Sequence, residues 1–488
     1  MSIVRQTTQV GALAVLPAGE WRERIVQGVA SGNRLVTMFG RAAGADALLL
    51  TAVLQRPRGS LEIVRGATSR GAGVHALTRD MPAAHCFERE MHEQLGMRVV
   101  GHPWLKPIRY EGANRGRMAE YPFYRLEGKE VHEVSVGPIH AGIIEPGAFR
   151  FMCLGETVHH LEIQLGYQHR AVEAMLLRGN PTALTPLVET IAGDTSIAHA
   201  WAYCAAIESL AGVHACEEVE ASRAVALELE RIAMHLSGLS GLAQDIGFAQ
   251  GASTYGRLRT TAINTSMILC GSRFGRGWLR PGGAQATMDA ATADVVRGNI
   301  ALLRHDIAII NERFVHATTV QHRFRGVGVV TMREARELGL VGLAARASGA
   351  AIDQRAFGGA MYSQFPIEPL VEATGDCWAR MRLRIREIDA SLAWLARVLE
   401  RFPTFTSVRS CPDSLAPEQL AVTVCEGWRG EVVHCIETDA TGRVLHYKVQ
   451  DPSLRNWFGL ALAVRTNEIS DFPICNKSFD LSYCGNDL

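Results

Sequence analysis

The stretch VALELERIAMHLSGL, residues 225–239, decides the fold of most of this chain. Its apolar residues at positions 225, 229, 232, 236 and 239 recur at steps of four and three, so they lie on one face of an α-helix. Residues 381–399 repeat this spacing and place Arg382, Arg386 and Asp389 on other faces. Both helices span about five turns or more. They predict a helical core in which long helices pack lengthwise.

Towards the C-terminus the apolar period changes from helical to alternating. Residues 421–425, 432–438 and 444–449 predict strands, and the turn DATGR (439–443) joins the last two as a hairpin. Near the N-terminus, residues 34–39 and 61–64 also predict strands.

The N-terminal region mixes these strands with a predicted helix in residues 81–95, which ends at Gly96. The glycine- and proline-rich stretch 107–122 predicts a linker. We therefore predict an α+β fold with a small α+β domain in residues 1–120. A mainly helical body follows in residues 121–488, with a small β insertion near its end.

Composition excludes several classes of function. Lys and Arg (50 together) balance Asp and Glu (50 together), so no surface for nucleic acid is predicted. The opening residues MSIVRQTTQ lack a basic segment followed by an apolar core, which predicts no secretion. The longest apolar stretches, such as residues 48–54, fall far short of the ~20 residues that a membrane-spanning helix needs. We expect a cytoplasmic protein that reaches a membrane only through partners.

The 11 cysteines contain no Cys-x-x-Cys pair, so the sequence predicts neither a zinc site nor an iron–sulfur cluster in this chain. Scattered single cysteines in a reducing compartment usually behave as small buried hydrophobic residues. They stand at positions 86, 153, 204, 216, 270, 377, 411, 425, 435, 475 and 484.

Several sequence runs resemble known families. Glu88-Arg89-Glu90 and Gly101-His102-Pro103 resemble the signature of the complex I 30-kDa-type subunit. From residue 134 onward the chain resembles the 49-kDa-type subunit and the large subunits of group 4 nickel–iron hydrogenases. The matching runs are VGPIHAGIIEPGAFRF (136–151), LGYQHRAVE (165–173), LELERIAMHL (227–236), RFGRGWLRPGG (273–283), GLVGLAARASGAAIDQR (339–355), EGWRGEVVH (426–434) and DPSLRNW (451–457). The fusion of both subunit types further resembles the formate-hydrogenlyase branch. The resemblance implies a hydrogenase large-subunit-like fold for the body.

The same resemblance implies four thiolates for a nickel–iron centre, supplied by two Cys-x-x-Cys pairs, because two of them must bridge the metals. This sequence has Ala192 and Thr195 at the first pair and Ser482 and Gly485 at the second. Cys484 is one residue out of register. We therefore expect no metal centre in this chain.

In complex I, the family pattern implies a quinone site in the same cavity, contacted by a His and a Tyr. Here Ala148 stands at the His position and Gly193 at or near the Tyr position. His140 and His199 could instead donate hydrogen bonds to a quinone carbonyl and deliver protons. The alternative for each is a histidine held by its own packed surroundings.

Asp194 and Thr195 stand where the metal would lie in a hydrogenase. A partly desolvated Asp194 could carry protons, and Thr195 could contact a bound quinone. Both could equally cap the helix predicted to begin near Ser196, and this capping role is favoured.

Five further charged residues are candidates for a functional role. Glu173 matches a family glutamate near the cavity and could transfer protons, or simply pair with Arg170. Arg429 matches an arginine that lies over the hydrogenase active site. Arg346, Asp353 and Arg355 resemble a charged set in the family core, which could fix geometry or link the cavity to a membrane arm.

Two functional hypotheses follow. The chain is a subunit of an NADH:quinone oxidoreductase-like complex, passing electrons from a partner's iron–sulfur cluster to a quinone or another small acceptor. Alternatively, it is a pseudo-hydrogenase scaffold of an ion-translocating complex. The first hypothesis requires an iron–sulfur small subunit, whereas antiporter-like membrane subunits alone would favour the scaffold. We expect an iron–sulfur small subunit and antiporter-like and other membrane subunits as partners, and a peripheral place on the cytoplasmic face of the inner membrane. The sequence has no nucleotide-binding glycine motif, so any NAD chemistry belongs elsewhere in the complex.

Overall fold

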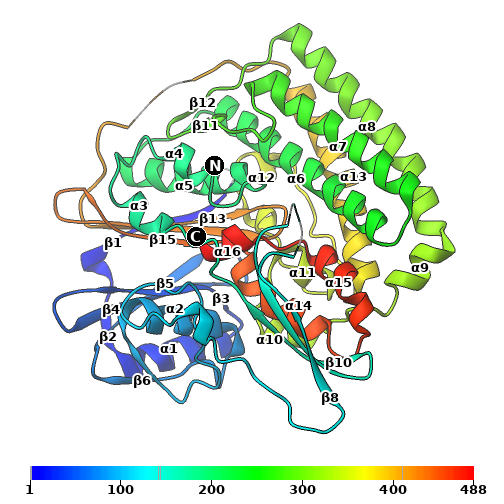
Figure 1. The fold of residues 1–488 in the computed structure, drawn as a ribbon. Helices are drawn as coiled ribbons and strands as arrows, with labels where there is room; N and C mark the ends of the chain where they lie inside the picture. The colour runs from blue at the N-terminus through cyan, green and yellow to red at the C-terminus, as the bar shows by residue number, and fades with distance from the viewer. Residues whose placement is uncertain (1–2, 141, 143, 409, 411) are drawn as a thin grey trace.

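The computed structural model describes residues 3–140, 142, 144–408, 410 and 412–488. Cys411, one of the predicted structural cysteines, lies outside these ranges. Figure 1 shows three parts: a small α+β unit at the lower left, a central sheet above it, and a bundle of long helices at the upper right. This arrangement confirms the predicted α+β fold.

The small unit is a four-stranded sheet in the order β2-β5-β4-β3, covered by two helices. The strands are β2 (Val15–Pro17), β3 (Arg34–Ala42), β4 (Ala47–Gln55) and β5 (Leu61–Ser69), and the helices are α1 (Ala18–Ala30) and α2 (His85–Leu95). Trp21 of α1 is buried against this sheet, and its indole N–H donates to the Val64 carbonyl (3.1 Å). A parallel pair, β6 (Gly73–His75) and β7 (Arg98–Val100), completes the unit.

The helix predicted in residues 81–95 is shorter at its start than expected. Residues 82–84 form a 3-10 turn, and α2 begins only at His85. Its predicted end is confirmed, because Gly96 adopts the left-handed conformation (φ 71°) that closes many helices.

The central sheet has the order β1-β13-β14-β15. It comprises β1 (Val4–Gln9), β13 (Gln419–Glu426), β14 (Glu431–Thr438) and β15 (Val444–Gln450), so the three predicted C-terminal strands are confirmed. Residues 4–9 therefore pair with a strand more than 400 residues later in the chain. The domain boundary at residue 120 remains a prediction.

Alternation along β13 explains why the central sheet is buried on both faces. Leu420, Val422 and Val424 pack against residues of the small unit's sheet, including Phe39. Cys425 belongs instead to the core of the helical body. On that second face lies α5 (Ser196–Ala211), whose Ala202 carbonyl accepts a hydrogen bond from Thr423 (2.8 Å).

The helical body is built on four long helices that lie side by side (Figure 1). They are α6 (Glu217–Asp245), α7 (Ala249–Cys270), α8 (Ala290–His316) and α13 (Cys377–Arg401). The two helices read from the sequence are α6 and α13, and their lengthwise packing is confirmed.

Shorter elements fill the space around these layers. The helices are α3 (Val172–Leu176), α4 (Thr185–Val188), α9 (Thr318–Phe324), α10 (Met332–Glu337), α11 (Gly342–Ala347), α12 (Met361–Gln364), α14 (Ser453–Ala463), α15 (Phe472–Phe479) and α16 (Tyr483–Asp487). The strands are β8 (Val131–Val136), β9 (Ala148–Leu154), β10 (Thr157–Gln164), β11 (Leu279–Arg280) and β12 (Gly283–Ala284). Strands β8, β9 and β10 form an antiparallel sheet that reaches away from the body at the lower right (Figure 1).

Buried ion pairs join the small unit to the central sheet. Glu431 of β14 accepts two hydrogen bonds from the Arg34 guanidinium (2.6 and 2.7 Å) and one from Arg455 (3.1 Å). Glu437 of the same strand pairs with Arg41 (2.8 Å) and Arg65. These contacts hold the two sheets against each other.

Within the described ranges, no helix is long and apolar enough to cross a membrane.

Replacing Glu431 with Ala should lower the unfolding free energy by about 3–5 kcal/mol, because it leaves the buried Arg455 guanidinium without its carboxylate. Guanidinium denaturation of the purified chain measures this change. The matched control is Glu120→Ala, which breaks an exposed pair with Arg117 and should change the value by less than about 1 kcal/mol. Equal effects of the two substitutions would contradict this account of the interface.

Candidate functional site

The candidate site forms where three distant segments meet. Asp194 and Thr195 directly precede α5, and Arg429 lies in the tight turn that joins β13 to β14. In this turn the Gly427 N–H donates to the Gly430 carbonyl (2.9 Å). A Cβ atom at position 427 would lie only 3.3 Å from Cγ2 of Thr195. Glycine at this position therefore lets the turn approach the start of α5.

An ion pair between Arg429 and Asp194 is the centre of the site. The guanidinium Nη1 and Nη2 donate to the two Asp194 carboxylate oxygens (2.6 and 2.7 Å), and Nη1 also donates to the Thr195 hydroxyl (3.1 Å). Arg429 stacks on the Trp428 ring at 3.8 Å and also donates to the Asp480 carbonyl. Burial alone would lower the pKa of Arg429, but the Asp194 carboxylate raises it above its usual value.

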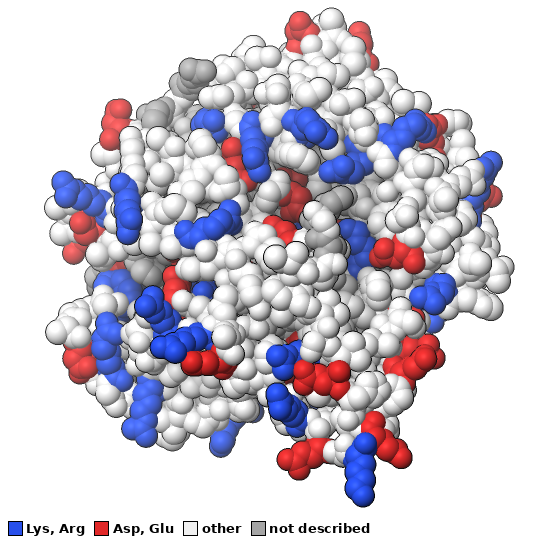
Figure 2. All heavy atoms as spheres, in the orientation of Figure 1, with Lys and Arg blue, Asp and Glu red and all other residues white. Residues whose placement is uncertain are grey.

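One edge of the ion pair is open. The Arg429 side chain is 5% exposed, whereas that of Asp194 is 39% exposed. Arginines lie around this edge: Arg273 lines a small cavity with Asp194, and Arg276 approaches Gly193. Figure 2 shows basic side chains across the upper half of this face, over α5, α6 and α7. The open edge of the site is therefore electropositive.

The favoured prediction that Asp194 or Thr195 caps α5 is wrong. Thr195 is the N-cap residue by position, but its side chain accepts no hydrogen bond from the helix amides. Glu230 of α6 takes that role, because its carboxylate accepts from the N–H groups of Ile197 (2.7 Å) and Ala198 (3.4 Å). Asp194 and Thr195 are engaged by Arg429 instead.

Glu230 is a buried titratable group that lines a small cavity together with Asp194. Burial raises its pKa to about 8, against the opposing effect of the two α5 amides, and the Asp194 charge raises it further. The side chain therefore holds a proton at neutral pH. Asp194 and Glu230 both line a cavity of about 10 Å³, which is room for about one water molecule.

His199 lies one helical turn further along α5, in a buried row of four polar side chains. Its Nε2 is 3.1 Å from the Asp451 carboxylate, and its Nδ1 is 3.1 Å from Nε2 of His434. Nδ1 of His434 is in turn 2.8 Å from the Tyr447 hydroxyl. Burial lowers the pKa of His434 well below its usual value, and His199 lowers it further. The contact between Nε2 and the Asp451 carboxylate fixes the orientation of the His199 ring.

The four positions at which the resemblance implies metal-binding cysteines lie in the same region. The side chains of Ala192, Thr195 and Ser482 are buried, and a Cβ at Gly485 would lie 2.6 Å from the Asp451 carboxyl carbon. The Ser482 hydroxyl accepts from the Gly485 N–H (2.9 Å) and so caps α16. These side chains supply no thiolate, and the donor set does not fit a nickel–iron centre.

Cys484, which lies beside the second pair of these positions, is a buried thiol 3.4 Å from the Ser482 hydroxyl. Burial raises its pKa to about 12, so it is protonated at neutral pH. No group of three or more His, Cys, Asp or Glu side chains that could hold a metal occurs in the described part of the chain.

Two predicted site residues lie elsewhere. Glu173 pairs with Lys448 (3.0 Å) and accepts from the Val449 N–H (2.9 Å), so the predicted pairing with Arg170 is wrong. Arg170 donates instead to backbone carbonyls of residues 190 and 191. Glu173 follows a left-handed Ala171 (φ 55°), which turns its side chain towards β15. This geometry explains why helical spacing misled the prediction.

His140 is half-buried in the loop before β9. Its Nδ1 is 3.2 Å from the Gly137 carbonyl oxygen, and its ring packs edge-on against Phe149. Among the described residues, His140 forms no hydrogen bond or ring contact with Asp194, His199 or Arg429. The structure therefore does not bring His140 into the same cluster.

The predicted charged set around Arg346 is completely buried. Arg346 pairs with Glu387 (2.7 Å) and Glu426 (2.7 Å), and Arg355 pairs with Asp353 (2.7 Å). Glu387 then contacts His235 (2.8 Å). A continuous row of paired charges thus runs between α6, α11 and α13.

Sequence reasoning missed three residues of the site: Glu230, His434 and Asp451. Each belongs to a run that resembles the family: Glu230 lies within residues 227–236, His434 is the last residue of 426–434, and Asp451 is the first residue of 451–457. Asp451 lies beside Gly485, a predicted ligand position, only in the folded chain. Because the two residues are far apart in the sequence, no local pattern could have revealed this proximity.

Comparisons with known proteins agree with this architecture. Residues 245–414 match the family described as "Respiratory-chain NADH dehydrogenase, 49 Kd subunit". The chain is similar to the membrane-bound hydrogenase subunit alpha of Pyrococcus furiosus, at 29% identity over 71% of this chain and 85% of the relative.

Two further relatives represent both branches of the resemblance. Formate hydrogenlyase subunit 5 of Escherichia coli is 28% identical over 84% of this chain and 76% of the relative. The C/D subunit of the NADH-quinone oxidoreductase of Phocaeicola vulgatus is 29% identical over 70% of this chain and 73% of the relative. The predicted relationship to complex I 49-kDa subunits and hydrogenase large subunits is confirmed. The chain is thus related to subunits of oxidoreductase complexes.

Glu230 should make the stability of this chain depend on pH. The unfolded carboxyl ionises near its ordinary value of 4.5, whereas the folded one keeps its proton to about pH 8. The folded state thus binds more protons in this window. The unfolding free energy should fall with rising pH between these values, by up to about 1.4 kcal/mol per pH unit.

Denaturant unfolding at pH 5, 6, 7 and 8 measures this slope, and Glu230→Gln should flatten it. Glu218→Gln, at an exposed position of the same helix, is the control and should follow the wild-type profile. If Glu230→Gln keeps the wild-type slope, Glu230 is not the protonated group.

Proposed function

We propose that this chain is the acceptor-reducing subunit of a complex I- and hydrogenase-related oxidoreductase. It takes electrons from the iron–sulfur cluster of a partner small subunit and passes them to a quinone or another small acceptor at the Asp194–Arg429 pair. It works without a nickel–iron centre. The observation that carries the proposal is this ion pair, which contacts Thr195 at one of the four ligand positions and is open on one edge.

The chemistry of such a reduction matches the groups present. A quinone that gains two electrons must also gain two protons to become a quinol. Arg429 can donate hydrogen bonds to the carbonyl oxygen on which negative charge develops, as preorganised donors do in other enzymes. Entry of the acceptor would exchange one Asp194 contact of Arg429 for a contact with that oxygen.

Protons can come from two groups near the cluster. Glu230 is protonated at neutral pH and faces Asp194 across a cavity that holds about one water molecule. His199, held by Asp451, is the second candidate. Each group would regain its proton from solvent after the quinol leaves.

Partners and location follow from the same proposal. An iron–sulfur small subunit docks near the electropositive edge, and antiporter-like and other membrane subunits anchor the complex. The chain itself is then peripheral, on the cytoplasmic face of the inner membrane. The names of the relatives support this, because one is a membrane-bound hydrogenase subunit and another an NADH-quinone oxidoreductase subunit.

A second candidate function is a non-catalytic scaffold that assembles or couples an ion-translocating complex. The observation that favours it is the internal pairing of the cluster. Arg429 and Asp194 satisfy each other, and the cavity between Asp194 and Glu230 is too small for a quinone ring.

Asp194→Asn should lower quinone reduction by the assembled complex at least about ten-fold, because it removes the charge that holds Arg429 in place. Initial rates with a soluble quinone and the complex's own electron donor measure this effect. The control is Asp294→Asn, which removes an exposed ion pair with Arg297 and should leave the rate unchanged.

Hydrogen uptake, assayed in parallel, should be absent. An unchanged rate in an assembled Asp194→Asn complex would remove this residue from the site. An intact wild-type complex that turns over no acceptor would establish the scaffold instead.

A further inference from the structure

Two buried cysteines lie side by side where the start of α13 meets α15. The Sγ atoms of Cys377 and Cys475 are 3.9 Å apart, although 98 positions separate the two residues in the sequence. Cys377 is the first residue of α13, and Cys475 lies in α15. Both are 0% exposed, and both carry free thiols. A disulfide holds its sulfurs about 2 Å apart, so a displacement of about 2 Å would join the two helices.

The charged group beside this pair is Arg380, one turn further along α13. Its Nη2 lies 3.4 Å from the Cys377 sulfur. The guanidinium also donates to the carbonyls of Gly375 (2.7 Å) and Gly328 (2.8 Å) and to the Ser478 hydroxyl (2.8 Å). Arg380 is buried, and in the described part of the chain it forms no ion pair with a carboxylate. A buried guanidinium without a carboxylate favours another anion nearby, and the Cys377 thiolate is placed to be that anion.

The two thiols therefore differ in charge at neutral pH. Burial alone would raise the pKa of Cys377, but the hydrogen bond with Cys475, the charge of Arg380 and the hydrogen bond with Ser478 lower it to about 6. The interaction with Cys377 raises the pKa of Cys475 well above its usual value, and burial raises it further. Cys377 is thus a thiolate nucleophile, and Cys475 is a protonated thiol in position to resolve its oxidation product.

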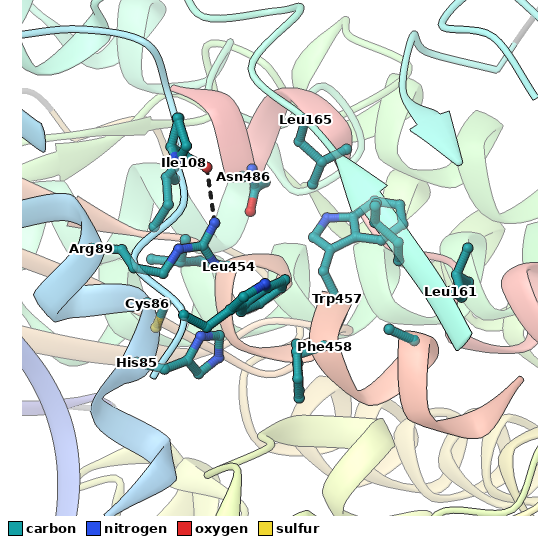
Figure 3. Close-up of a pocket in the computed structure, with 14 residues that line it drawn as sticks. His85, Cys86, Arg89, Ile108, Leu161, Leu165, Leu454, Trp457, Phe458 and Asn486 are labelled. Carbon is teal, nitrogen blue, oxygen red and sulfur yellow. Dashed lines mark hydrogen bonds between the residues drawn. The ribbon is translucent and has the colours of Figure 1, made fainter. Parts of the chain in front are cut away.

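A guanidinium near a buried cysteine does not by itself produce a thiolate. Cys86 lies in the wall of a small chamber between α2 and α14, which Arg89 also lines (Figure 3). Burial raises the pKa of this thiol, and the charges of Arg455 and Arg89 do not offset the effect. Among the described residues, no second cysteine contacts Cys86. Cys86 is therefore a matched reference for Cys377 within the same chain.

The cysteine pair lies beneath a thin cover formed by residues 325–329. The Cys377 N–H donates to a carbonyl of this segment (2.9 Å), and a Cβ at Gly328 would lie 2.7 Å from the Cys475 sulfur. Gly328 is buried and left-handed (φ 66°), so glycine lets the backbone pass this close to the sulfur. Val329, the next residue, is exposed. A local opening of this single segment gives a molecule as small as a peroxide access to the pair.

We propose that Cys377 and Cys475 form an oxidisable dithiol, which hydrogen peroxide converts to a disulfide that cross-links α13 to α15. The Cys377 thiolate attacks one peroxide oxygen and the O–O bond breaks, which gives a sulfenic acid and hydroxide. Cys475 then attacks the Cys377 sulfur, so that the S–S bond forms and the hydroxyl group leaves as water. Together the two thiols lose two electrons to one peroxide, and their protons complete two water molecules. In a reducing compartment such a disulfide is transient and serves redox sensing.

The test treats the purified native complex, which contains the full chain, with hydrogen peroxide. Catalase stops the reaction, and N-ethylmaleimide then blocks the remaining thiols under denaturing conditions. Peptide mass spectrometry should find a Cys377–Cys475 cross-link that is lighter by two hydrogen atoms than the separate peptides and is cleaved by dithiothreitol. In the same samples Cys377 should lose its free thiol at least about ten-fold faster than Cys86, because Cys86 stays protonated.

Two variants separate the roles of the two sulfurs. In Cys475→Ser, oxidation of Cys377 should stop at the sulfenic acid, which dimedone traps. In Cys377→Ser, Cys475 should keep its thiol, and dimedone should trap nothing at this position. The control is Cys270→Ser at the end of α7, which should form the cross-link at the wild-type rate.

Two results would overturn the proposal. One is a wild-type complex in which Cys377 and Cys475 still react with N-ethylmaleimide after the exposed Cys216 has been oxidised. The other is oxidation of Cys377 beyond the sulfenic acid without a cross-link to Cys475. If a variant fails to assemble, the mapping of the wild-type complex and its comparison with Cys86 decide alone. Because the thiols themselves are measured, this outcome does not depend on electron transfer at the Asp194–Arg429 pair.

Discussion

The fold depends on burying a connected set of charges without leaving any of them unpaired. Arg346 is fully buried and contacts Glu387 and Glu426 at 2.7 Å. Removing one member of such a set costs far more than the pair contributes, because the remaining charge stays buried. These pairs join α11, α13 and β13, and β13 leads directly into the turn that carries Arg429. The position of the candidate site is therefore set by charge pairing deep in the body.

Much of the fold could be predicted from the sequence. The steps of four and three in α6 and α13 and the alternation in β13 to β15 are local signals, and each predicted the correct element. The start of α2 was missed because Pro82 falls in a 3-10 turn. The pairing of residues 4–9 with β13 could not be predicted, since no local pattern specifies a partner strand so far away.

The candidate site was predicted in part. Asp194, Thr195 and Arg429 do come together. His199 lies one helical turn further along α5 and contacts Asp451, which lies beside Gly485. Their roles were harder to predict, because hydrogen-bond partners depend on tertiary contacts. Helix α5 is capped by a carboxylate from α6 rather than by the residues before it. The residue types preferred at helix N-termini favoured Asp194 and Thr195 as caps. A cap that comes from another helix cannot be recognised from the residues next to α5.

The most direct test of the central claim is the nickel content of the purified complex, measured by mass spectrometry relative to the amount of this chain. The side chains at the four ligand positions supply no thiolate, so the account predicts nickel far below one atom per chain. One nickel atom per chain, accompanied by hydrogen-dependent electron transfer, would contradict it.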